Sequence, residues 1–238
     1  MNGINSFFVI FNNSTNIDLD ISVVKRPNIP SPVREYKETS VPGRNGKLYE
    51  DLKTYSDIII PVEFNFFEYD TNKFNEIFKK IKRWINNIKD EKLKFSDDLS
   101  FFYIVNKTEI TNSIREIKKL GKFTVNFTCK PLMFLEEGQQ EIALPSSLFN
   151  DYELAQPTYK ILGEGLLTLT INGISVTANV GQNLIIDTEK GLCYRIDGTL
   201  NNIALTGKYE DLYLKEGNNT FSWSSGFTIT VVPNWRCL

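Results

Sequence analysis

Side chains alternate between apolar and polar through much of this 238-residue chain, and a period of two is that of a β-strand. The alternation is clearest at residues 122–130 and recurs at residues 58–66. Such a strand buries one face and exposes the other to solvent. Because a proline cannot donate a hydrogen bond to a neighbouring strand, Pro61 predicts that the strand at 58–66 lies at a sheet edge or carries a bulge. An exposed edge can accept another subunit.

A helical period is convincing only at residues 72–89. The apolar residues of this segment fall on one stripe, formed by Phe74, Ile77, Phe78, Ile81, Trp84, Ile85 and Ile88. A stripe of this width predicts an amphipathic helix that packs on a sheet. Lysines and Arg83 spread over the rest of its surface, so we interpret them as a solvated face, with nucleic-acid contact as the minor alternative.

The second half of the chain reads as strands alone. Residues 167–171 and 176–180 flank Asn172-Gly173, a pair that favours a tight hairpin turn because both residues accept a positive φ. Further short strands are predicted at 184–186, 192–196, 212–214, 221–223 and 227–231. This spacing is typical of a β-sandwich. The predicted fold is therefore mainly β with one long α-helix.

Charge divides the chain into two unlike parts. Residues 1–135 carry 21 Lys and Arg against 17 Asp and Glu, whereas residues 136–238 carry 6 against 12. The resulting charges of +4 and −6 add up to the net −2 of the whole chain. A change of sign at a loop-like stretch predicts a boundary between two domains, 1–135 and 136–238.

The chain contains no histidine, which removes the usual general base and the commonest metal ligand. Its three cysteines, Cys129, Cys193 and Cys237, lack the spacing of a metal site and are expected to be reduced thiols. No apolar run approaches the ~20 residues of a membrane helix. We therefore expect no metal, no cofactor, no membrane insertion and no enzymatic activity.

Two patterns leave alternatives open. Asp97-Asp98 and Glu136-Glu137 could supply hydrolytic carboxylates, but adjacent residues of a strand point to opposite faces. The second half also holds aromatic residues that could stack on sugars, namely Tyr194, Tyr209, Tyr213, Trp223 and Trp235. We interpret them as core, with a carbohydrate-binding β-sandwich module for host-surface adhesion as the alternative function.

The segment 43–47 contains two glycines but lacks the spacing and the hydroxyl of a phosphate-binding loop. Its Asn45-Gly46 pair is better explained as the turn of a β-hairpin.

An ordered set of segments resembles one family. In the first half these are residues 41–49, 58–66, the helix around Trp84, 93–98 and 121–131, and in the second half 156–161, 163–165, 185–187, 217–223 and 233–236. Together they resemble the distal tail protein, Dit, of long-tailed non-contractile bacteriophages, which belongs to the tail-tip and baseplate hub proteins. The resemblance spans nearly the whole chain.

The resemblance implies that residues 1–135 form a tail-tube-like β domain and residues 136–238 a peripheral galectin-like β-sandwich. It implies a structural homo-hexameric ring at the tip of the phage tail in the virion, made beforehand in the host bacterial cytoplasm. The ring would join the tail tube protein to the tail-associated lysin or tip protein, and its periphery would carry receptor-binding proteins. DNA would pass through the ring without specific binding.

Strand edges and hairpins can lend main-chain groups to a neighbouring subunit. We therefore expect the hairpin at 41–49 and the strand at 58–66 to contribute to subunit contacts. The interface residues predicted on this basis are Val41, Gly43, Arg44, Gly46, Tyr49, Ile58 and Ile60. Because Lys and Arg hold phosphates, a channel for DNA should be neutral or acidic, and the helix with Lys79, Lys80 and Arg83 should face away from it.

Overall fold

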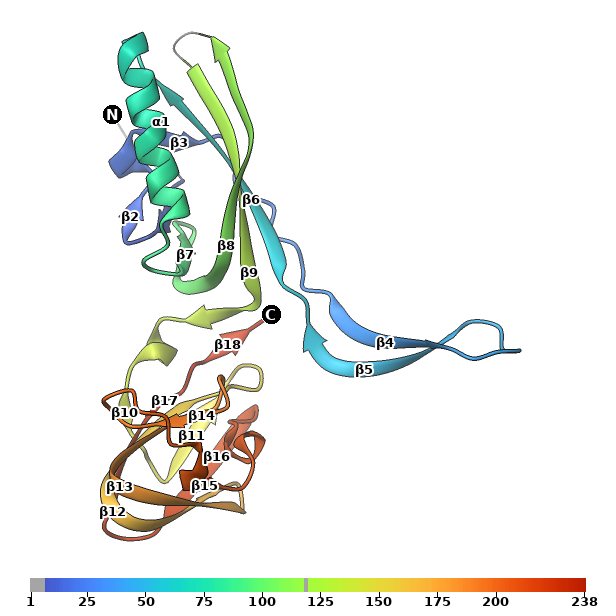
Figure 1. Ribbon diagram of the computed structural model, residues 1–238, viewed down its shortest axis with the longest axis vertical. Helices are drawn as coiled ribbons and strands as arrows, with labels where there is room; N and C mark the ends of the chain where they lie inside the picture. The colour runs from blue at the N-terminus through green and yellow to red at the C-terminus, as the bar shows by residue number, and fades with distance from the viewer. Residues whose placement is uncertain (1–6, 118–119) are drawn as a thin grey trace. The chain divides into compact units, whose positions relative to one another are not determined.

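The computed structural model describes residues 7–117 and 120–238 (Figure 1). The chain forms two compact units, Met1–Met133 with Leu238, and Phe134–Cys237. Strands dominate the described residues of both units, and α1 (Thr71–Asn86) is their α-helix. The predicted fold class, mainly β with one long helix, is confirmed.

The first unit is built on one mixed-length sheet. Its strands are β1 (Val9–Phe11), β2 (Ser14–Thr15), β3 (Ile21–Val23), β6 (Ile58–Phe67), β7 (Lys92–Phe95), β8 (Asp98–Ile117) and β9 (Leu120–Leu135). They follow the order β2-β1-β7-β8-β9-β6-β3. A short 3-10 helix, Ile17–Leu19, precedes β3.

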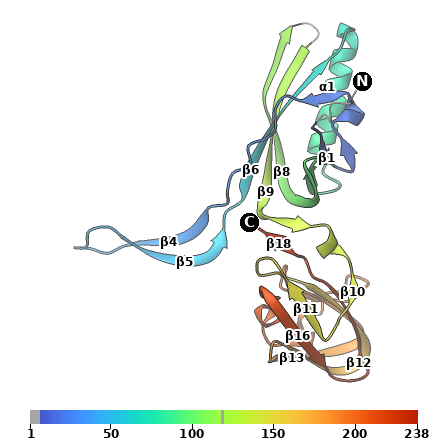
Figure 2. The ribbon, with the colours of Figure 1, turned by 180° about the vertical axis from the view of Figure 1, so that it is seen from behind.

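Figure 2 shows α1 lying beside this sheet, and the core of the first unit is formed by side chains of both. Burial alternates along β6 and along most of β9, as their sequence period predicts. The stripe of α1 meets this face through Phe74, Ile81, Trp84 and Ile85, all of them buried. The fold of this unit therefore follows from two periods, one of a strand and one of a helix.

The prediction for Pro61 needs a correction. β6 lies inside the sheet between β9 and β3, and its register with β9 runs without a shift from Ile58 to Phe67. β3, however, pairs only with Phe64, Asn65 and Phe66. Residues 58–62 of β6, which include Pro61, have no second strand beside them among the described residues. Pro61 is thus tolerated because the sheet is locally open there, with no bulge in the ladder to β9.

The second unit is a branched sheet. Its strands are β10 (Ile142–Ala143), β11 (Ser147–Asn150), β12 (Thr158–Ile171), β13 (Ile174–Asp187), β14 (Leu192–Tyr194), β15 (Leu205–Thr206), β16 (Gly217–Trp223) and β17 (Thr228–Val232). The last strand of the chain, β18 (Arg236–Cys237), pairs instead with β9. The main path is β10-β17-β12-β13-β14, β15 pairs with β13, and β16 joins β11 to β12. 3-10 helices occur at Glu137–Gln139, Asn202–Ala204 and Tyr209–Leu212.

The strands β12 and β13, at 14 residues each, organise this unit. They are joined by the predicted turn, in which Asn172 has φ 51° and Gly173 has φ 83°. The first part of β12 pairs with β17 and its last residues pair with β16. Between these two stretches Gly163 and Gly165 adopt φ 148° and 110°, conformations that allow the strand to bend and change partner. The sheet consequently curls around its core.

The predicted strand at 212–214 is wrong. Leu212 ends the 3-10 helix Tyr209–Leu212, and Leu214 forms only an isolated bridge with Ala155. Both leucines are buried, so a short helical turn satisfies the same apolar-polar-apolar pattern as a strand. Three residues are too few to distinguish the period of a strand from that of a helix.

The last strand is held by hydrogen bonds within the second unit. Asn234 donates from its main chain to the carbonyl oxygen of Gly138 at 2.8 Å and from Nδ2 to the carbonyl oxygen of Gln156 at 2.9 Å. Arg236 donates from Nε to the carbonyl oxygen of Leu154 at 2.7 Å. Residues 234–236 therefore belong to the packing of this unit.

Cys129 and Cys193 are buried free thiols. Burial raises the pKa of the Cys129 thiol to about 12, so it stays protonated at neutral pH. Of the helices in the described part of the chain, none combines the length and the apolar character needed to span a bilayer.

Candidate interaction surface

The most exposed element of the first unit is a β-hairpin. It consists of β4 (Arg34–Ser40), β5 (Lys47–Tyr55) and the loop 41–46 between them, which we call the tip loop. Among the residues that the structure describes, the two strands pair only with each other, in a separate sheet (Figure 1). Every residue of both strands is exposed except Tyr55, which is half-buried. A two-stranded ribbon is at best marginally stable alone in water, so this hairpin is suited to packing against another protein.

The tip loop joins the two strands of a hairpin, as the sequence predicts, but its hydrogen-bonded turn lies at 41–44, whereas Asn45 and Gly46 form only a bend. Gly43 and Gly46 adopt φ 79° and 80°, in the left-handed region that glycine tolerates. The main-chain N–H of Arg44 donates to the carbonyl oxygen of Val41 at 3.2 Å. Apart from each glycine and its chain neighbours, no described atom lies within 4 Å of the position that a Cβ would take there. The glycines are therefore needed for backbone conformation and not for space.

Cross-strand ion pairs join the two strands of the hairpin, whose register shifts once, between Arg34 and Tyr36. Arg34 Nη2 lies 2.8 Å from Asp51 Oδ2, and Lys37 Nζ lies 3.6 Å from Glu50 Oε2. Lys47 forms a third pair with Glu38. The main-chain N–H of Lys53 and the guanidinium of Arg34 together lower the pKa of Asp51. Exposed pairs add little stability, but opposite charges across a ladder disfavour a shifted register.

Apolar side chains also line the hairpin, although both of its faces are open to solvent. Tyr36 and Tyr49 meet edge to face with their ring centroids 6.3 Å apart, and Tyr49 is 63% exposed. The other large apolar side chains exposed on the hairpin or just before it are Val33, Val41, Leu48 and Leu52. Apolar groups gathered on a thin ribbon indicate a surface that another protein covers.

The predicted interface residues fall into two groups. Val41, Arg44 and Tyr49 are exposed on the hairpin, and Gly43 and Gly46 shape its tip loop. The side chains of Ile58 and Ile60 are instead buried in the core of the first unit, with exposures of 4% and 0%. These two residues have only main-chain atoms to offer a neighbour. The interface itself stays a prediction.

Sequence reasoning missed Ile59, which is 54% exposed on the opposite face of β6. Its position between two buried isoleucines was the available signal, because alternate residues of a strand point to opposite faces. Ile59 lies in the stretch 58–62 where β6 has no second described partner strand. An apolar side chain beside an open sheet edge extends the candidate surface beyond the hairpin.

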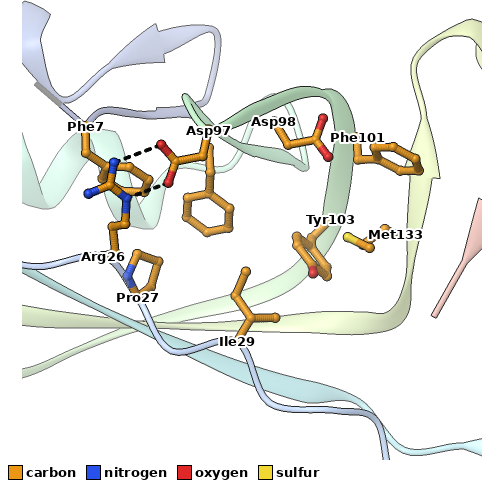
Figure 3. A pocket seen from close by; sticks show the side chains of 10 residues that line it. Phe7, Arg26, Pro27, Ile29, Asp97, Asp98, Phe101, Tyr103 and Met133 are labelled. Atoms are coloured by element: carbon orange, nitrogen blue, oxygen red, sulfur yellow. Dashed lines mark hydrogen bonds and ion pairs between the residues drawn. The ribbon is translucent and has the colours of Figure 1, made fainter. Parts of the chain in front are cut away.

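The first unit also contains a cavity of about 410 Å³, shown in Figure 3. Its walls are apolar for the most part, with Phe7, Pro27, Ile29, Phe95, Phe101, Tyr103 and Met133, and its charged residues are Arg26, Asp97 and Asp98. We call it the Asp98 cavity. The rings of Phe7 and Phe95 stack with their centroids 6.0 Å apart.

The two aspartates of this cavity differ in their bonding. Arg26 donates to Asp97 through two hydrogen bonds, from Nε to Oδ2 at 2.7 Å and from Nη2 to Oδ1 at 3.1 Å, and this lowers the pKa of Asp97. Asp98 Oδ1 accepts from the main-chain N–H of Ser100 at 3.1 Å. In Figure 3 the two carboxylates do not converge on one point. The geometry therefore differs from the facing pair of acids that a glycosidase needs.

The aromatic residues of the second unit lie where packing explains them. Tyr209, Trp223 and Trp235 are partly buried and pack against its hydrophobic core. Tyr194 and Tyr213 are half-buried. Within the described residues, His, Cys, Asp and Glu side chains do not gather in any group of three that could hold a metal ion.

Residues 11–129 match the family model described as phage tail protein RIFT-related domain. The Dit protein (gp 19.1) of SPP1, described as a paradigm of the hub adsorption apparatus in phages that infect Gram-positive bacteria, shares the fold with a TM-score of 0.65. The two chains are 14% identical over 98% of this chain and 99% of that one. A chain of the phage P2 baseplate in its activated conformation with Ca aligns over 98% of both chains, with a TM-score of 0.47 and 8% identity. No curated protein sequence matches this chain.

Proposed function

This chain belongs to the family of phage tail proteins with a RIFT-related domain, and on that premise we propose that it is a distal tail protein. In this role it acts as a structural adaptor that assembles as a hexameric ring at the tip of the tail. The resemblance that the sequence predicts is confirmed by the family model and by the fold. Membership of the family also places the chain in the tail of a phage virion.

The single observation that carries the proposal is the hairpin formed by β4 and β5. Its strands are exposed on both faces, ion pairs join them, and they present the tyrosines Tyr36 and Tyr49 to solvent. A ribbon of this kind suits a protein that packs against copies of itself, because the neighbour supplies the cover that a two-stranded sheet lacks.

Contacts of this kind generate a ring when they are head-to-tail. A surface on one subunit that binds a different surface on the next subunit repeats, and it closes when the rotation per subunit divides the circle. The hairpin and the open stretch 58–62 of β6 are two distinct surfaces of the first unit. The number six comes from the family resemblance.

In the proposed ring the second unit is peripheral, and the first unit surrounds the DNA channel. The ring would join the tail tube above to the tail-associated lysin or tip protein below, and receptor-binding proteins would attach at its periphery. The cations of α1, including Lys79, Lys80 and Arg83, are exposed. Cations lining a channel would retain DNA through its phosphates. In the proposed ring, α1 therefore faces away from the channel.

The function is tested by measuring the mass of the purified full chain with light scattering over a range of concentrations. We expect a species of six times the mass of the chain. The variant Leu48→Asp/Tyr49→Asp places charges on the hairpin and should give monomers. Ile203→Asp is the matched control, since Ile203 is 95% exposed in the second unit, and it should assemble normally.

Two results would count against the proposal. A wild-type chain that stays monomeric at high concentration contradicts the ring. A hairpin variant that assembles like the wild type contradicts the role of the hairpin and leaves the ring itself standing.

A further inference from the structure

We propose that the tip loop of one copy inserts into the Asp98 cavity of the next copy, with Val41 and Pro42 against its apolar walls and Arg44 beside Asp98. The inference rests on the proposed ring, and it names one pair of surfaces that meet in each head-to-tail contact, separate from the open stretch 58–62 of β6. Both surfaces belong to the first unit.

The cavity is suited to apolar side chains of another protein. Its volume of about 410 Å³ falls within the ~300–1,000 Å³ of ordinary binding pockets, and aromatic rings form much of its wall. Ile29, at its rim, is exposed in the isolated chain. Covering this wall with a valine and a proline would remove apolar surface from water.

Charge distinguishes Asp98 from its neighbour. Asp97 is already neutralised by the two hydrogen bonds from Arg26. Asp98 accepts a hydrogen bond from Ser100, but no ion pair involves it among the described residues. A partner that fits this cavity should therefore combine an apolar part with one positive charge.

The tip loop has that combination. Arg34, Lys37 and Lys47 of the strands each pair with an acidic residue across the hairpin. Arg44 is exposed, and within the described part of the chain it makes no ion pair. Val41 and Pro42, beside it in the same loop, are exposed as well. An arginine can pair with a carboxylate through two parallel hydrogen bonds, which fixes its orientation.

The geometry of the hairpin requires that the loop come from another copy. Pro27 and Ile29 line the cavity, and they lie shortly before Arg34, where β4 begins. β4 has 7 residues, which separate the base of the hairpin from the tip loop by about 20 Å at ~3.3 Å per residue. A cavity at the base cannot receive the tip of its own hairpin while the strands stay paired. A contact from tip to base is head-to-tail, which is the type that closes into a ring.

Charge exchange tests the contact. In Arg44→Glu and in Asp98→Arg, like charges meet, so the concentration at which half of the protein is assembled should rise about tenfold or more, tenfold being ~1.4 kcal/mol. The double variant Arg44→Glu/Asp98→Arg restores opposite charges and should recover most of the assembly. Asp98→Asn removes the charge but keeps an oxygen that can accept the hydrogen bond from the Ser100 N–H. This variant therefore tests the effect of the charge on docking without removing the local hydrogen bond. Lys79→Glu on α1 is the charge-matched control and should assemble as the wild type does.

A disulfide locates the contact directly. The variant Pro42→Cys/Phe101→Cys, in a Cys237→Ser background, should form disulfide-linked chains up to hexamers under mild oxidation. A disulfide within one chain would show that the loop folds onto its own cavity and would overturn the inference. So would rings that form normally in all charge variants, and that result would leave the proposed function intact. A wild-type chain that never assembles would instead refute the proposed function as well.

Discussion

The indole Nε1 of Trp84 donates a hydrogen bond of 2.8 Å to the main-chain carbonyl oxygen of Phe11. The rings of the two residues meet edge to face, with centroids 6.1 Å apart. Asn12, next to Phe11, donates from Nδ2 to the carbonyl oxygen of Trp84 and accepts the N–H of Lys89 at 2.7 Å. Trp84, near the end of α1, and Lys89, beyond that end, are therefore both held by the adjacent residues Phe11 and Asn12 at the end of β1.

Replacing Trp84 by Phe should destabilise the first unit. The variant leaves the buried carbonyl oxygen of Phe11 without this donor, which costs about 1–3 kcal/mol in the free energy of unfolding. Urea denaturation measures the change. Trp223→Phe is the matched control, because the Trp223 indole makes no hydrogen bond within the described part of the chain, and it should lose less. Equal losses in the two variants would show that the hydrogen bond contributes nothing.

Tyr159 should make the stability of the second unit depend on pH in the alkaline range. Its side chain is fully buried, its hydroxyl donates to the carbonyl oxygen of Leu212 at 2.8 Å, and burial raises its pKa well above the ordinary value. The unfolded chain releases this proton near pH ~10, whereas the folded chain keeps it. Because the folded state then binds more protons, stability falls as the pH rises above ~10.

Tyr159→Phe should therefore be less stable than the wild type at pH 8, by about 1–2 kcal/mol for the lost hydrogen bond. Above pH ~10 the gap between the two proteins should narrow, by up to ~1.4 kcal/mol per pH unit. Urea denaturation at a series of pH values between 8 and 11 follows it. A gap that stays constant over this range would mean that the native tyrosine ionises like the unfolded one.

The tip loop should be sensitive to its two glycines. Both adopt a positive φ that a β-branched residue resists, so Gly43→Val/Gly46→Val should distort the loop and impair ring formation in light scattering. Nothing crowds either position, so the fold of both units should survive, as circular dichroism would show. Normal assembly of this variant would be incompatible with a role for the loop's conformation.

The sequence predicts most of the strands because their signals are local. Alternation along β6 and β9, the stripe of α1 and the Asn172-Gly173 turn each depend on residues within one short segment. The 3-10 helix Tyr209–Leu212 was missed because a single apolar-polar-apolar triplet fits either structure. The sequence also could not predict that β3 pairs with only part of β6, since this depends on where the distant strand β3 ends.

The candidate surface was predictable only in part. The hairpin can be predicted from its glycines and its position before β6. That the side chains of Ile58 and Ile60 are buried, and so unavailable to a partner, depends on which face of β6 packs in the core with α1. The Asp98 cavity was not foreseen. Its walls come from residues as far apart as Phe7, Ile29 and Met133, and only the tertiary fold brings them together.

The most direct measurement of the central claim is electron microscopy of the purified full chain at high concentration. We expect annular particles with six-fold symmetry and an open centre. At higher resolution, Lys79, Lys80 and Arg83 should lie away from that centre. Solitary particles of one chain, or rings whose bore is lined by these three cations, would contradict it.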